Sequence, residues 1–107
     1  MNTLRAQFDI TVGEQTLPCI LSMNAFRLLT QDHGIKLEEI DSFIESDPMT
    51  GLAALAHVGC KNAAALRGQK LKMSFDQFAA ILLDDVDSLQ AISEAFTAAM
   101  GGEPGNE

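Results

Sequence analysis

Residues 47–68 are DPMTGLAALAHVGCKNAAALRG, and this stretch carries the signals of one long helix. Asp47 is suited to the N-cap, because its carboxylate can accept a hydrogen bond from a free N–H of the first turn, and Pro48 suits the first helical position. Gly68 suits the residue that follows a helix, where a positive φ is common. Apolar and small residues at helical spacing predict one buried stripe: Leu52, Leu55, Ala56, Gly59, Ala63 and Leu66. We expect a central core helix; the alternative is a small-residue groove that receives a partner's helix.

Residues 6–21 predict a β-hairpin. Apolar and polar residues alternate over residues 6–12, Gly-Glu at 13–14 forms a two-residue turn, and residues 15–21 return as the second strand. With this turn, one face of the hairpin carries Phe8, Ile10, Leu17 and Cys19. Pro18 cannot donate to a strand ladder, so the second strand is placed at a sheet edge.

Two helices are expected between the hairpin and the central helix. The first is capped by Ser22 or Asn24 and ends at Gly34. The second is short and spans residues 36–45. Its inward side chains are expected to be Leu37, Ile40, Phe43 and Ile44.

Two more helices follow the central one. Ser74 and Gln77 have the spacing of a capping box, and so do Asp87 and Gln90. The last helix is expected to end at Gly-Gly, residues 101–102. The predicted fold is therefore mainly α, with about five helices and a short N-terminal hairpin, in one domain over residues 1–100 followed by a disordered tail at 101–107.

Composition narrows the classes of function. With 107 residues and 47% hydrophobic residues, the chain has the size of one domain with a single core. A formal net charge of −8 opposes binding to nucleic acid or to an anionic membrane surface. No apolar run is long enough to span a membrane or to serve as a signal peptide, so we expect a cytoplasmic protein.

Charge is uneven along the chain. Lys61, Arg67, Lys70 and Lys72 fall close together, and neither Lys nor Arg occurs after Lys72. The acidic last third is interpreted as a solvated face, with a docking surface for a basic partner as the alternative.

Residue types that could carry chemistry lack the required spacing. His33, His57, Cys19 and Cys60 are zinc-ligand types, but no CxxC or HxxxH spacing joins them. His57 and Cys60 are three residues apart in the central helix, which is typical of core packing as well as of a catalytic dyad. We predict no metal, no cofactor and no catalytic residue.

Residues 87–89, Asp-Ser-Leu, are similar to the DSL motif of acyl carrier proteins, whose serine receives a phosphopantetheine arm. In that family two further helices follow the helix that the serine begins. Here only one helix follows Ser88, and a hairpin leads the chain. An acyl-carrier-like protein or a generic acidic interaction module remains the alternative function.

The complete order of elements resembles the tail assembly chaperones of tailed bacteriophages and prophages, the lambda-like tape-measure chaperone group. The resemblance covers residues 6–100. After the hairpin and a helix ending at Gly34 come LEEI at 37–40, LAALA at 52–56, a capped helix from Ser74 and the acidic break DDVD at 84–87.

That resemblance implies a non-enzymatic helper that binds the long helical tape-measure protein and keeps it soluble until tube subunits polymerise around it. The tail tube protein is a further candidate partner, and a homo-oligomer is compatible with the sequence. The client is expected to dock as an amphipathic helix in an apolar groove. Three residues near helix ends or beside the tail are the candidate partner-binding residues: Phe75, Phe96 and Met100.

Overall fold

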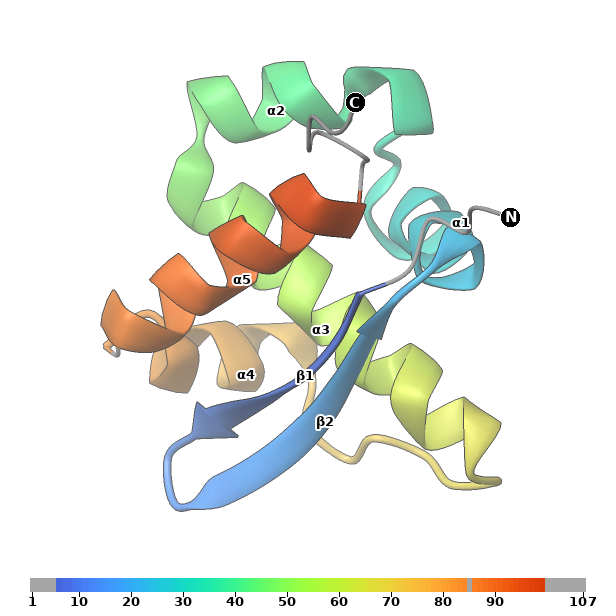
Figure 1. The fold of residues 1–107 in the computed structure, drawn as a ribbon, viewed down its shortest axis with the longest axis vertical. Coiled ribbons are helices and arrows are strands. Elements are labelled where there is room, and N and C mark those ends of the chain that lie inside the picture. The colour runs from blue at the N-terminus through green and yellow to red at the C-terminus, as the bar shows by residue number, and fades with distance from the viewer. Residues whose placement is uncertain (1–5, 85, 100–107) are drawn as a thin grey trace.

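A computed structural model of the protein describes residues 6–84 and 86–99 (Figure 1). The elements in chain order are β1 (Ala6–Val12), β2 (Gln15–Leu21), α1 (Met23–His33), the 3₁₀ helix η1 (Leu37–Glu39), α2 (Ile40–Ser46), α3 (Pro48–Leu66), α4 (Phe75–Leu82) and α5 (Val86–Ala99). A mainly helical domain with five α-helices and an N-terminal antiparallel hairpin is thus confirmed. The expected tail at 101–107 lies outside the described residues.

Helix α3 runs through the middle of the molecule and is its organising element (Figure 1). It contacts β2, α1, α2, α4 and α5. As a result, residues 53–60 are all buried, on every side of the helix. The expected stripe is buried at Leu55, Ala56, Gly59 and Ala63, but burial is not confined to one stripe, and Leu66, its last expected member, is 63% exposed.

The small residues of α3 make room for the chain's own neighbouring elements. A Cβ at Gly59 would overlap the sulfur of Cys19 and lie 3.0 Å from Leu21 Cδ2, both in β2. A Cβ at Gly51 would lie 2.9 Å from Ile44 Cγ1 in α2. The expected central core helix is thus observed, and the alternative, a small-residue groove for a partner's helix, does not fit because the hairpin and α2 fill that space.

The hairpin has the predicted register. Gly13 has φ of 67°, as the tight turn requires, and Val12 pairs with Gln15, Ile10 with Leu17 and Phe8 with Cys19. The inward face of β1 is buried at Ile10 and Val12 while its other face is exposed. In β2 burial does not alternate but increases along the strand, from the exposed Gln15 and Thr16 to the buried Cys19, Ile20 and Leu21.

Three of the predicted helix signals are confirmed in detail. Asp47 Oδ1 accepts a hydrogen bond from the Thr50 N–H at 3.2 Å, and Ser74 Oγ accepts one from the Gln77 N–H at 3.2 Å. Gly34 ends α1 with φ of 71°, a conformation that glycine adopts without a Cβ clash.

Three other details differ from expectation. Ser22 occupies the N-cap of α1, but its hydroxyl accepts a bond from Asn62 instead of capping the helix. The helix expected at 36–45 begins as the 3₁₀ helix η1, and Leu37 is 39% exposed because it lies in that first turn. Asp87 lies inside the first turn of α5, which begins at Val86, so Asp87 is not its N-cap.

Candidate functional site

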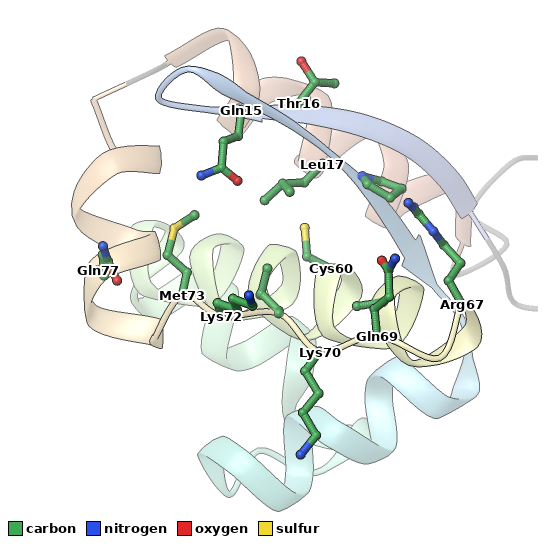
Figure 2. Close-up of a pocket in the computed structure, with 13 residues that line it drawn as sticks. Gln15, Thr16, Leu17, Cys60, Arg67, Gln69, Lys70, Lys72, Met73 and Gln77 are labelled. Carbon is green, nitrogen blue, oxygen red and sulfur yellow. The ribbon is translucent and has the colours of Figure 1, made fainter.

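A cavity of about 730 Å³ opens between the start of β2 and the segment that connects α3 to α4 (Figure 2). The second half of α3 forms its floor, where Cys60 and Ala64 lie. Leu17 and Met73 add apolar surface from the two sides. We call this cavity the β2 groove. Its lining residues are Gln15, Thr16, Leu17, Pro18, Cys60, Ala64, Arg67, Gln69, Lys70, Leu71, Lys72, Met73 and Gln77.

The side of β2 that faces away from β1 borders this groove. The Ile20 carbonyl accepts a hydrogen bond from Asn62 Nδ2 at 3.0 Å, so the C=O of Ile20 is directed away from β1. Because the direction of backbone polar groups alternates along an antiparallel strand, the N–H and C=O of Thr16 and the C=O of Pro18 lie on the same edge as those of Ile20. Pro18, which has no N–H, thus occupies a position where β1 requires no donor.

The opposite side of the groove is formed by residues 69–72, a segment without regular secondary structure. Gln69 donates its N–H to the Ala64 carbonyl at 2.8 Å, which closes the turn after α3. Across the described parts of the chain, the backbones of residues 70–72 form no hydrogen bond with another backbone group. The groove is therefore lined on one side by the outer edge of β2 and on the other by residues 70–72, and in both segments backbone polar groups lack a backbone partner among the described residues.

The groove is positively charged at its rim, although the whole chain is strongly acidic. Arg67, Lys70 and Lys72 line it, and its lining residues include no Asp or Glu. None of these three cations forms an ion pair with a carboxylate of residues 6–84 or 86–99. Figure 2 shows the Lys70 side chain directed away from the cavity, so Arg67 and Lys72 supply the charge nearest the groove.

The sequence-predicted partner-binding residues do not line this groove. Phe96 is 8% exposed and belongs to the hydrophobic core. Phe75 is partly buried, and its ring packs edge-on against His33, with ring centres 4.7 Å apart. Met100 lies outside the described residues. A role of these three residues in partner binding stays a prediction.

Two histidines flank Phe75 in a compact aromatic cluster. The His57 ring lies 5.7 Å from the Phe75 ring and 5.2 Å from the Phe78 ring, and its Nε2 donates to the Met73 carbonyl at 3.1 Å. The remaining nitrogen of His57 and Nε2 of His33 are buried without a partner among the described residues. Burial lowers the pKa of both imidazoles, because it disfavours the charged form.

The two thiols contact each other between β2 and α3. A hydrogen bond with Cys60, together with burial, holds the pKa of Cys19 well above its usual range. Cys19 is also 3.9 Å from the Ala56 carbonyl oxygen. Such a thiol carries little thiolate, the form that attacks substrates. The geometry favours core packing for Cys60 and His57 over a catalytic dyad.

The Ser88 hydroxyl is buried and donates to the Thr11 carbonyl at 3.3 Å. A serine that receives a prosthetic arm must be open to solvent, so this burial argues against the acyl-carrier interpretation.

The described residues contain no group of three or more His, Cys, Asp or Glu placed to hold a metal ion. None of the described helices combines the length and the apolar character needed to cross a bilayer.

Sequence reasoning missed the β2 groove and the residue that orients its edge, Asn62. Asn62 is 1% exposed and bonds Ile20, Ser22 and Asn24. A signal was nevertheless present, because Pro18 marked a strand edge and the basic residues clustered at 61–72. What the sequence did not provide was the packing that brings these two segments together.

Searches against protein-family models, curated proteins and solved structures found no match for this chain.

Proposed function

We propose that this protein is a non-enzymatic tail assembly chaperone of a tailed bacteriophage or prophage. In the bacterial cytoplasm it binds the tape-measure protein and keeps it soluble while the tail tube assembles, with the tail tube protein as a further candidate partner. The proposal begins from the resemblance in element order, and the order found in the structure, from β1 to α5, is compatible with it.

The observation that carries the proposal is the β2 groove. It combines an apolar floor, a strand edge with free backbone groups and a charged rim, which are the means by which proteins hold peptide segments. Its polar side chains are amides, a threonine hydroxyl and cations, and its one thiol, Cys60, is 2% exposed. This arrangement suits binding better than a reaction.

Two exposed methionines add support. Met23 is 51% exposed and Met49 is 58% exposed, while Met73 lines the groove. Methionine side chains are flexible and polarisable, so they adapt to different apolar partners. This is a useful property for a protein whose client offers a long, repetitive helical surface.

Two steps test the proposal. Reading the neighbouring genes should reveal a very long, predominantly helical open reading frame directly downstream. An affinity-tagged form of this chain, co-expressed with each tail protein encoded at its own locus, should then retain the tape-measure protein. If no tail protein of the locus is retained, the proposal is wrong.

A further inference from the structure

We propose that the β2 groove binds an extended peptide segment in which apolar and acidic residues alternate, and that this segment adds to the free edge of β2 as a third strand. The inference concerns how a partner is held. It stands independently of whether that partner is a tape-measure protein, and it differs from the helical docking that the sequence suggests.

Backbone geometry indicates an extended occupant. The N–H and C=O of Thr16 and the C=O of Pro18 lie on the open edge of β2, and residues 70–72, whose backbones form no hydrogen bond with another described backbone group, line the other side of the groove. A strand placed between them could form hydrogen bonds on both sides, as in the addition of a peptide to a sheet edge. A helix satisfies its own backbone groups and would leave these free.

The dimensions set the length of the segment. The part of β2 that lines the groove, residues 15–18, is four residues long. At roughly 3.3 Å per residue, this edge spans about 13 Å. The groove therefore holds a short extended segment of about four residues rather than a whole domain.

The residues that line the β2 groove determine which side chains the bound segment should carry. Alternate side chains of a strand point to opposite faces, so one set would contact the apolar floor at Ala64, where Cys60 is covered. The other set would lie near Arg67 and Lys72, which have no carboxylate partner within the described residues. Carboxylates are the groups that complement such cations. The occupant is therefore an alternating apolar and acidic strand.

The test uses two fluorescein-labelled peptides, one of alternating valine and glutamate and one of alternating valine and lysine, with binding measured by fluorescence anisotropy. If net charge decided binding, the basic peptide would bind better, because the chain carries −8. The proposal predicts the opposite order, with the glutamate peptide favoured about tenfold or more.

Charge reversal then locates the site. Arg67→Glu and Lys72→Glu should each weaken binding of the glutamate peptide several-fold. Lys36→Glu is the matched control, because it changes the net charge equally at an exposed residue outside the groove, and it should leave affinity unchanged. Circular dichroism confirms that each variant is folded.

Amide hydrogen exchange gives a second measurement that the charge changes do not affect. Binding of the glutamate peptide should slow exchange of the Thr16 N–H, which the added strand would engage. The inference is overturned if the lysine peptide binds equally or better, if neither peptide binds at about 1 mM, if Lys36→Glu weakens binding as much as Lys72→Glu, or if Thr16 exchange is unchanged. None of these results bears on retention of the tape-measure protein, which tests the proposed function separately.

Discussion

Gly59 is a residue where α3 and β2 lie in close contact. A helical glycine normally weakens a helix relative to alanine by about 1 kcal/mol. Here the glycine is required, because a Cβ would overlap the Cys19 sulfur and crowd Leu21. The missing side chain lets a strand lie directly against a buried helix.

Gly59→Ala is therefore expected to destabilise the protein by about 1–3 kcal/mol, as in other overpacked cores. Urea unfolding measures the change. Cys19→Ala removes the sulfur that the new methyl group would meet, so the double variant should lose less stability than the sum of the two single changes. Strict additivity would mean that the two side chains do not compete for this space.

The buried imidazoles of His33 and His57 should make the stability of the fold depend on pH. Burial lowers the folded-state pKa of His33 and His57 below the usual histidine value of 6.5, so above that pH the imidazoles are neutral in the folded and the unfolded state and the fold has its full stability. As pH falls below 6.5, the unfolded state binds protons first, and stability is lost progressively down to the folded-state pKa. The positive charge of Lys61 lowers the pKa of both imidazoles further and adds to the effect of burial, whereas Asp32 raises both and the bond to the Met73 carbonyl raises that of His57.

Urea unfolding between about pH 7.5 and 5.5 should show this loss in the wild type. His33→Gln and His57→Gln should each flatten the pH dependence, whatever they do to stability at neutral pH. An unchanged slope in both variants would contradict neutral, buried imidazoles in the fold.

At the scale of elements, Asn62 joins three parts of the molecule. From α3 it donates to the Ile20 carbonyl and to the Ser22 hydroxyl, each at 3.0 Å, and it accepts from Asn24 in α1 at 2.8 Å. These bonds fix where the hairpin ends and α1 begins, and they hold the β2 edge in the orientation that opens it to the groove.

Asn62→Leu keeps a similar volume but leaves the buried Ile20 carbonyl without its donor. We expect a loss of about 1–3 kcal/mol in the free energy of unfolding. Asn24→Ala, which removes only the exposed partner, is the control and should cost less. An equal loss of unfolding free energy in the two variants would show that the hydrogen bond to Ile20 adds nothing to stability.

The sequence predicted elements well where the signal is local. The turn at residues 13–14, the caps Asp47 and Ser74 and the glycine stop at Gly34 each depend on neighbouring residues alone, and the structure has them as expected. The hairpin register followed from the turn length.

Predictions that depend on packing between distant segments were less successful. The buried stripe of α3 assumed one covered face, whereas elements from both ends of the chain surround the helix. Ser22 was one of two candidates, with Asn24, to cap α1, but its hydroxyl accepts a hydrogen bond from Asn62, 40 residues away. The β2 groove was missed for the same reason, since it forms only when residues 15–18 and 67–73 come together.

At the scale of the whole molecule, the chain as a whole is negative whereas the rim of the β2 groove is positive. The chain carries −8 overall, which keeps copies apart and favours solubility, while Arg67 and Lys72 concentrate positive charge beside the free edge of β2. A protein of this kind could hold an exposed segment of a client and lend the complex its own negative charge. Both properties suit a chaperone of an insoluble, elongated protein.

The most direct measurement is the solubility of the tape-measure protein from the same locus, expressed with and without this chain and scored by sedimentation and size-exclusion chromatography. The account predicts that the tape-measure protein sediments when expressed alone, and that it stays soluble and elutes together with this chain when both are expressed. A tape-measure protein whose solubility is the same in both cases, and which elutes apart from this chain, would contradict it.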